Sequence, residues 1–321
     1  MNRIIQMGIF FSVFISILIL LNSYVVFRLS GMLKIHNKAL IYGLVLFLTL
    51  GFPVWTMIEN FMPNLFTRIL YAISASWMGI MFYFLCALLL YEVVRFIVKI
   101  DTKIAGIVVI AVVGLITIVA VVNAAMVSVK EVDIELDGLK EDLKIVQLSD
   151  VHIGTIRNSG YLNMIVEKVN ELDPDVVVIT GDLVDGTAPL RSSMFSAFNK
   201  LRAKIFFVNG NHETYEGLDR VHALFNKSKI KVLSDEVVTF DGIQIVGVEY
   251  GERGSALRDR LESIKIDEKK PAILLYHTPT GMDFAREKGV DLMLTGHTHA
   301  GQIVPFNFFT WLVYKRVQGL Y

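Results

Sequence analysis

Two histidines lie one residue apart in the segment Thr295-Gly296-His297-Thr298-His299. Neutral imidazole is the side chain most often used as a metal ligand in proteins. The pair follows an apolar run, Leu292–Leu294, that is typical of a buried strand, and the glycine allows the backbone to turn sharply. Because alternate side chains of an extended strand point the same way, His297 and His299 are expected on one face. Such a pair alone is weak evidence, so its meaning depends on partners elsewhere in the chain.

Side chains of the same chemical kind follow four other apolar runs, each typical of a strand. At any one strand end, aspartate, asparagine or histidine can simply form a turn. Five such sites in one sheet, all offering oxygen or nitrogen, favour a metal centre instead. The set includes five of the seven histidines of the chain. The candidate residues are Asp150, His152, Asp182, Asp185, Asn211, His212, His277, His297 and His299.

The number of these side chains implies more than one metal ion. Carboxylate, amide and imidazole ligands without thiolate suit Mn, Fe or Zn. One carboxylate bridging two divalent ions gives a two-metal arrangement with the ions roughly 3.5–4 Å apart. Such a centre clamps both the attacking and the leaving oxygen of a phosphoryl group during displacement.

Strands and helices alternate in the segment that carries these residues. This alternation predicts an α/β sheet with its sites at the carboxyl ends of the strands. Helical periodicity is found at 161–172, with Leu162, Ile165, Val166 and Val169 on one face, and a second helix is predicted at 218–225. The predicted strands are 143–148, 175–180, 205–208, 243–248, 272–276 and 291–294.

The overall composition indicates a chain with a membrane part. Its 321 residues allow about two domains. A hydrophobic content of 54% and a mean hydropathy of +0.54 are too apolar for an ordinary soluble protein. The net charge of +0 predicts no nucleic-acid partner. Because Cys86 is the single cysteine, a disulfide framework and a thiolate metal site are both excluded.

The apolar excess is concentrated before Met126, and after Lys130 the composition is typical of a soluble α/β protein. Four stretches reach the roughly 20 apolar residues that a membrane-spanning helix needs, at 4–27, 39–58, 69–94 and 104–126. The first is too long for a signal peptide, and no small-residue cleavage pattern follows it. We therefore expect a four-span transmembrane domain at 1–128 and a catalytic domain at 129–321.

Basic residues predict the orientation of the four spans. The first connection carries Arg28, Lys34 and Lys38, and the third carries Arg95, Lys99 and Lys103. Because cytoplasmic connections are rich in lysine and arginine, the catalytic domain of this multi-pass protein is expected on the extracytoplasmic side. Few ionisable residues lie in the spans, apart from Glu92 within helical reach of Arg95, which gives little support for a transporter.

Five short blocks together resemble a known superfamily. They are Asp150-x-His152, Gly181-Asp182-x-x-Asp185, Gly210-Asn211-His212-Glu213, His277 and Gly296-His297-x-His299. In this order they resemble the calcineurin-like metallophosphoesterases, and within them the membrane-attached bacterial branch that includes enzymes hydrolysing UDP-2,3-diacylglucosamine. The resemblance covers about residue 129 to the end. It implies an α-helical membrane domain followed by a four-layer αββα sandwich.

The resemblance also implies roles for the candidate residues. Asp150, His152 and His299 would bind the first ion, and Asn211, His277 and His297 the second. Asp182 would bridge the two ions. His212 would not be a ligand but a general acid or electrostatic stabiliser, held in place by Asp185. Water would then attack phosphorus, and the leaving oxygen would be protonated.

Two features depart from the family pattern. Ala300 follows the last histidine, where relatives often have glycine. The sequence stops at Tyr321, whereas relatives typically continue through further strands, so the sandwich is expected to be truncated, incomplete at its C-terminus or closed differently. The aromatic segment 306–321 would either cover the core or touch the membrane beside the site. Gln302 would either contact substrate or serve a structural role.

The favoured function is a membrane-anchored two-metal phosphoesterase that hydrolyses a phosphomonoester, phosphodiester or pyrophosphate. The alternatives are a scaffold protein without catalysis, a membrane sensor or transport-associated protein with a regulatory phosphoesterase domain, and a UDP-2,3-diacylglucosamine pyrophosphatase. The lipid bilayer is an expected partner and favours a lipid-linked substrate. Because the catalytic domain is expected outside the cytoplasm, a cytoplasmic nucleotide-sugar lipid is disfavoured as its substrate. Nothing in the sequence indicates an oligomeric state.

Overall fold

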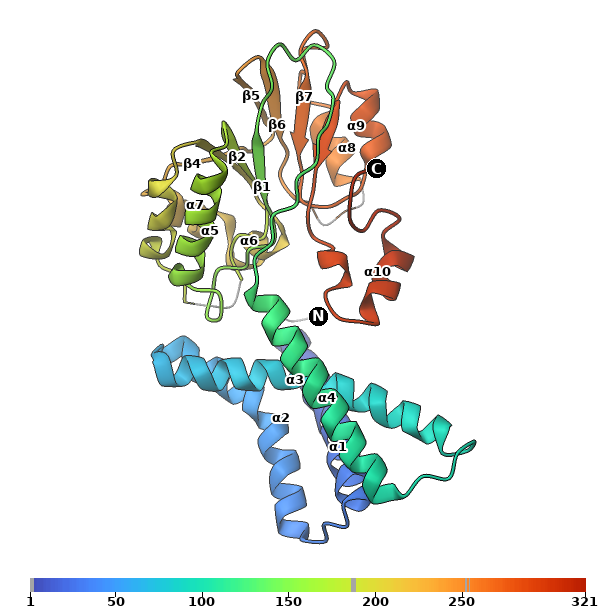
Figure 1. Ribbon diagram of the computed structural model, residues 1–321. Coiled ribbons are helices and arrows are strands. Elements are labelled where there is room, and N and C mark those ends of the chain that lie inside the picture. Colours follow the sequence, from blue (N-terminus) through green and yellow to red (C-terminus); the bar gives the residue numbers. More distant parts are fainter. Residues whose placement is uncertain (1–2, 186–188, 252, 254) are drawn as a thin grey trace. The chain divides into compact units, whose positions relative to one another are not determined.

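The computed structural model describes residues 3–185, 189–251, 253 and 255–321 (Figure 1). The chain divides into two compact units, Met1–Lys130 and Glu131–Tyr321. The first unit is helical and the second contains both helices and strands. The expected order, apolar helices followed by an α/β domain, is therefore confirmed.

The described part of the first unit, from residue 3 on, contains four long helices. All four are long and apolar enough to cross a membrane by length and composition. Polar side chains define several of their first turns: Asn37 and Asp101 accept hydrogen bonds from the main chain three residues on, and Asn64 forms a capping box with Thr67. The helices are α1 (Arg3–Met32), α2 (Lys38–Phe61), α3 (Leu65–Val94) and α4 (Thr102–Ala125).

A few polar contacts tie these helices together. Asn22 of α1 is buried; its amide donates to the Thr49 hydroxyl of α2 over 3.3 Å and its oxygen accepts from Trp77 of α3 over 2.9 Å. Such contacts satisfy polar groups that an apolar surrounding would otherwise leave unpaired. In the same way the Thr67 hydroxyl donates to the buried Glu59 carboxylate over 2.5 Å.

Glu92 joins two basic side chains of the first unit. Its carboxylate oxygens lie 2.5 Å from Arg28 Nη2 and 2.8 Å from Arg95 Nε. The predicted contact between Glu92 and Arg95 is confirmed. Arg28 on α1 is a second partner of Glu92, which the sequence did not predict. Helix α1 extends to Met32, five residues past the predicted end of the apolar stretch at residue 27.

The described residues of the second unit form two sheets of four strands each. In the first sheet all strands are parallel, in the order β1 (Ile145–Leu148), β2 (Val176–Thr180), β3 (Lys204–Val208) and β4 (Ile230–Val232). In the second sheet β5 pairs antiparallel with β6 and the other pairs are parallel. Its order is β5 (Glu236–Phe240), β6 (Ile243–Gly247), β7 (Ala272–Leu275) and β8 (Leu292–Leu294).

Helices cover the outer face of each sheet (Figure 1). The first sheet packs against α5 (Ser159–Leu172), the 3-10 helix η1 (Ser192–Lys200) and α7 (Leu218–Phe225). The second packs against α8 (Ala256–Leu261) and α9 (Met282–Glu287). Between the sheets lies a third apolar core, which includes Val178, Phe206, Ile245 and Ile273. The four-layer αββα arrangement predicted from the sequence is confirmed.

The predicted strands agree with β1, β2, β3, β6, β7 and β8 to within two residues at each end. Near-continuous apolar runs mark strands that are buried on both faces, and β2 is such a strand. The sequence patterning did not predict β4 and β5. Strand β4 is three residues long with an exposed lysine at its centre, and β5 is only partly buried, so neither produces a clear apolar run.

Candidate metal centre

The carboxyl ends of the central strands meet at one edge of the two sheets. In the first sheet Leu148 is paired with Ile179 and Thr180 with Val208, while in the second sheet Leu275 is paired with Leu294. The loops that follow these strands therefore leave the sheets at similar heights. The segments after the strands, which include the first residues of α6 (Asn211–Glu216) and of the 3-10 helix η2 (His299–Gly301), carry all nine side chains that the sequence singled out. The structure arranges most of them in two clusters.

The first cluster contains Asp150, His152 and His299. The His299 Nε2 atom lies 3.2 Å from an Asp150 carboxylate oxygen and 3.1 Å from His152 Nε2. Two imidazole nitrogens that face each other at this distance need a proton or a cation between them, because their lone pairs repel.

The second cluster contains Asn211, His277 and His297. The Asn211 side-chain oxygen lies 3.1 Å from His277 Nε2 and 3.0 Å from His297 Nδ1, and the two ring nitrogens are 3.2 Å apart. His277 is fully buried and Asn211 nearly so. Three potential ligand atoms thus point at one small volume.

Asp182 lies between the two clusters. Its Oδ2 atom is 3.2 Å from His277 Nε2 in the second cluster and 3.9 Å from His152 Nε2 in the first. Its other oxygen accepts a hydrogen bond of 2.9 Å from the His212 main-chain N–H. One oxygen of this buried carboxylate thus lies within 4 Å of an imidazole nitrogen in each cluster.

These side chains fit divalent metal ions. Ligand atoms on one ion at bond lengths of about 2.1 Å are separated by about 3.0 Å when they are neighbours in an octahedron. The contacts within the two clusters are 3.0–3.2 Å. The donor set is oxygen and imidazole nitrogen, which suits Mn, Fe or Zn. These distances match the separation of ligand atoms that bind one ion, and they do not distinguish Mn, Fe and Zn.

The protonation states in the first cluster suit metal binding. Burial raises the pKa of Asp150, but hydrogen bonds from His299 and Ser149 and the charges of His277 and His299 outweigh it and lower that pKa to about 2. Burial and the nearby His212 lower the pKa of His152 to about 4. Asp150 is therefore ionised and His152 neutral near pH 7, the forms that bind a metal ion.

Hydrogen bonds orient the His277 ring. Its Nδ1–H donates to the Thr180 carbonyl over 2.8 Å, which directs Nε2 towards Asp182 and Asn211. Although burial lowers the pKa of His277, the hydrogen bond and charge of Asp182 raise it overall. A proton shared with Asp182 would leave when a cation binds there, because metal ions bind the neutral imidazole.

His212 lies beside the clusters rather than in them. Its Nδ1 donates to the main-chain carbonyl of Asp185 over 2.5 Å, and its Nε2 is 3.9 Å from Asp182 Oδ2. The sequence-based interpretation expected Asp185 to hold His212. The Asp185 main chain makes this hydrogen bond, and a carboxylate oxygen of Asp185 lies within 4.8 Å of ring nitrogens of His152 and His212. Because a carbonyl only accepts, Nδ1 carries a hydrogen and Nε2 is the atom that can exchange a proton.

The expectation that His297 and His299 share one face of an extended strand is wrong. Strand β8 ends at Leu294, and both histidines have positive φ angles, 74° and 47°. This left-handed backbone turns the two side chains apart, so that His297 joins the second cluster and His299 the first. Asp150, His152 and Asp182 also have positive φ. Non-glycine residues adopt this conformation at a cost, and such strain is concentrated at functional sites.

The role of Gly296 also differs from the expectation. Its φ is not positive in the described structure, so a sharp turn is not what requires glycine. A Cβ atom at this position would collide with the side chains of Ser149 and Asp150. Likewise, a Cβ at Gly210 would collide with the Asp182 carboxylate. Both glycines are needed because acidic side chains of the centre pack directly against the main chain.

Sequence reasoning missed the role of Glu213. This fully buried carboxylate accepts hydrogen bonds from the main-chain N–H groups of Asp182, Val184 and Gly210, at 2.9, 3.0 and 2.7 Å. It therefore connects the loop after β2 to the loop after β3 and positions Asp182. Burial raises its pKa. The glutamate is part of the Gly-Asn-His-Glu block, but two of its three partners, Asp182 and Val184, are about thirty residues away in the chain.

Tyr314 is a second residue that sequence reasoning did not identify. Its hydroxyl lies 2.9 Å from His297 Nε2, on the side of the ring opposite to the ligand atom Nδ1. Partners of this kind fix the orientation of a metal-binding imidazole. No sequence signal marked Tyr314, because it is one aromatic residue in an aromatic-rich segment.

Replacing Tyr314 with phenylalanine is expected to weaken metal binding at the second cluster by roughly 10-fold, since loss of an outer partner of a ligating histidine typically costs 10- to 100-fold. Metal titration of the metal-free protein, followed by calorimetry, would measure this change. The control is Tyr161→Phe, which alters an aromatic ring on α5 that contacts Arg157. Equal affinities in Tyr314→Phe and the unmodified protein would contradict a positioning role.

Part of the chain is similar in sequence to known proteins. Residues 143–301 match the model of the calcineurin-like phosphoesterase family. A protein of Helicobacter pylori described as an uncharacterized metallophosphoesterase is 38% identical over 201 residues, which is 60% of this chain and 54% of that protein. A bovine transmembrane protein with a metallophosphoesterase domain is 34% identical over 232 residues, which is 64% of this chain and 52% of that protein. The chain thus spans about half the length of the curated relatives it matches.

Proposed function

Because residues 143–301 match the model of the calcineurin-like phosphoesterase family, we propose that this chain is a membrane-anchored hydrolase of phosphoric esters with a two-metal centre. The observation that carries the proposal is the position of Asp182 between two clusters of ligand atoms. Asp150, His152 and His299 would hold one ion, and Asn211, His277 and His297 would hold the other. Asp182 would contact both.

When bound, the two ions would act as Lewis acids that stabilise the charge developing on the phosphoryl oxygens. Buried hydrogen bonds, such as that of His277 to the Thr180 carbonyl, fix the imidazole rings. Asp182 and these imidazoles hold both sides of the centre rigidly and so orient the phosphoryl group. His212 presents Nε2 at the margin of the centre and donates a proton to the leaving oxygen.

The proposal is tested with the full-length protein in detergent micelles. After metal is removed by a chelator, an aryl phosphodiester should not be hydrolysed, and added manganese should restore turnover. Zinc and iron are compared in parallel, because the donor set does not select among the three. A metal-loaded protein that cleaves neither phosphodiesters nor phosphomonoesters nor pyrophosphate would contradict the proposal.

We further propose that the four apolar helices cross the membrane and that the phosphoesterase domain lies outside the cytoplasm. The support comes from Arg28, Lys34 and Lys38 between α1 and α2, and from the basic residues between α3 and α4. A reporter that is active only outside the cytoplasm, fused after Tyr321, should be active. A reporter active only in the cytoplasm would reverse the orientation and would favour a nucleotide-sugar lipid as the substrate.

A further inference from the structure

Helix α10 (Phe306–Val313) presents an apolar surface next to the metal centre. All residues of this helix are described, and none of them is buried. We define the α10 patch as Phe308, Phe309, Trp311, Leu312 and Val313, whose side chains are between 55% and 74% exposed. Contiguous exposed apolar side chains of this size usually mark an interaction surface.

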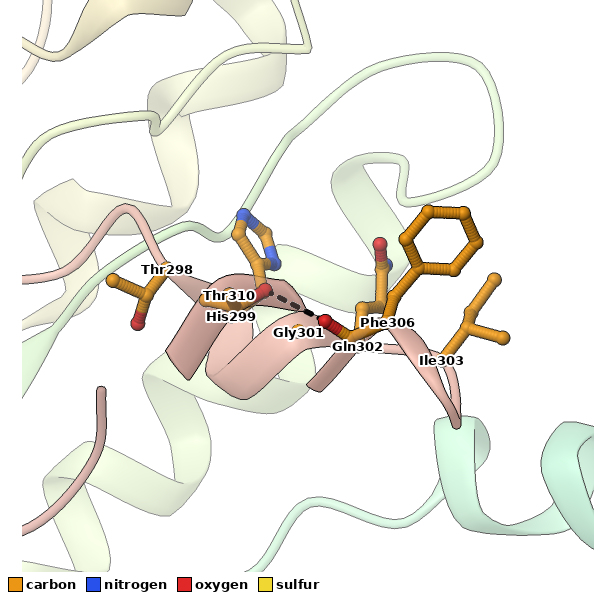
Figure 2. A pocket seen from close by; sticks show the side chains of 7 residues that line it. All are labelled: Thr298, His299, Gly301, Gln302, Ile303, Phe306 and Thr310. Atoms are coloured by element: carbon orange, nitrogen blue, oxygen red, sulfur yellow. Dashed lines mark hydrogen bonds between the residues drawn. The ribbon is translucent and has the colours of Figure 1, made fainter. Parts of the chain in front are cut away.

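The segments before and after α10 both contact residues of the metal centre. Before it, η2 (His299–Gly301) packs against α10, and a recess of about 320 Å³ is lined by His299, Gln302, Phe306 and Thr310 (Figure 2). After it, the Tyr314 hydroxyl contacts His297, and the Val317 carbonyl accepts a 2.7 Å hydrogen bond from Thr298. The patch is therefore held close to residues of both metal-binding clusters.

The composition of α10 matches a helix that lies in the surface of a bilayer. Trp311 and three phenylalanines supply the aromatic side chains that favour the boundary between lipid and water. Lys315 and Arg316 lie just after Tyr314, beyond the end of the helix, and would complement anionic phospholipid head groups. The polar residues of the helix are Asn307 and Thr310, and Thr310 contributes to the recess rather than to the patch.

The chain itself limits how far the second unit can lie from a bilayer. The four helices of the first unit have the length and composition to cross a membrane. Between α4 and β1 lies the segment 126–144, all of which is described and which forms neither helix nor strand. An extended chain spans at most about 3.5 Å per residue, so this connection limits the separation of the second unit from the membrane to on the order of 65 Å.

We propose that the α10 patch inserts into the surface of the bilayer and that the metal centre acts on phosphoesters in lipid head groups. The second part rests on the proposed phosphoesterase function, whereas the first part does not. Insertion would place the recess beside His299 at the level of the head groups, so a lipid phosphoester would reach the centre without leaving the membrane.

The first test measures the depth of α10 with the full chain in vesicles of phosphatidylcholine and phosphatidylglycerol. In a Cys86→Ser background, an environment-sensitive fluorophore is attached at Leu312→Cys or, as the control, at Ala223→Cys on the exposed side of α7. Lipids with a quencher on the acyl chain should quench the label at residue 312 several-fold more strongly than the label at residue 223.

Equal quenching at the two positions would overturn the proposal. So would a label at residue 312 that is shielded from aqueous iodide but not quenched by lipid, because a second copy of the chain or another protein would then cover the patch. This measurement needs no catalytic activity. A failure of insertion is thereby distinguished from a failure of the proposed function.

The second test concerns the substrate. An aryl phosphodiester carrying acyl chains is mixed into the vesicles and compared with its water-soluble counterpart, so that the reacting groups are identical. In the variant Phe308→Ser/Trp311→Ser/Leu312→Ser, the ratio of turnover on the vesicle-held ester to turnover on the soluble ester should fall roughly 10-fold. The control Met164→Ser, on the exposed side of α5, should keep the ratio. An unchanged ratio in the triple variant would overturn the lipid-substrate proposal.

Discussion

Replacing Asp182 with asparagine is expected to lower turnover of an aryl phosphodiester by on the order of 10³-fold, together with loss of bound metal. The carboxylate is the side chain between the two clusters, and its Oδ2 atom faces His277 on one side and His152 on the other. The amide is neutral, and its NH₂ group would direct hydrogen towards imidazole nitrogens that are needed as ligands. One substitution would therefore weaken both of the proposed metal positions.

Folding should survive this change. Asparagine retains an oxygen that can accept the hydrogen bond from the His212 main chain. Circular dichroism would establish that the fold is kept, and mass spectrometry of the metals would give the ion content per chain. The matched control is Asp173→Asn, which removes a carboxylate from an exposed ion pair with Arg202. Normal metal content and normal turnover in Asp182→Asn would refute the bridging role.

Replacing His212 with alanine is expected to lower kcat by 10²- to 10⁴-fold while metal content stays constant. The reason is geometric, because the ring belongs to neither cluster and its Nδ1 is held by the Asp185 carbonyl. Removal of the ring thus leaves the predicted ligands in place. It takes away the one group here assigned to protonate the leaving oxygen.

Two measurements separate the possible roles of His212. If Nε2 donates a proton, the loss should be large for an alkyl leaving group and much smaller for p-nitrophenolate, which leaves without protonation. If the ring only stabilises charge on the phosphoryl group, the loss should be similar for both esters. His222→Ala on α7 is the matched histidine control. Full activity of His212→Ala on both esters would exclude either role.

Much of the fold was predictable because apolar periodicity reflects local burial. The four long apolar stretches became α1 to α4, and the β-branched run at 175–180 became the fully buried β2. Short or half-exposed strands such as β4 were missed, since their pairing comes from tertiary contacts and not from their own sequence. The chemical kind of the centre was also predictable, because nine oxygen- and nitrogen-bearing side chains follow strands whose ends must meet at one sheet edge.

The sequence by itself thus determined the layered fold class and the identity of the polar side chains at the strand ends. Only the tertiary structure decided how these side chains are divided. His297 and His299 diverge because contacts with Asp150 and with the segment around Val317 hold their loop in a left-handed conformation that no local preference favours. Glu213 and Tyr314 acquire their roles through partners that are distant in the chain, or on another element, and such contacts leave no periodic signal in a sequence.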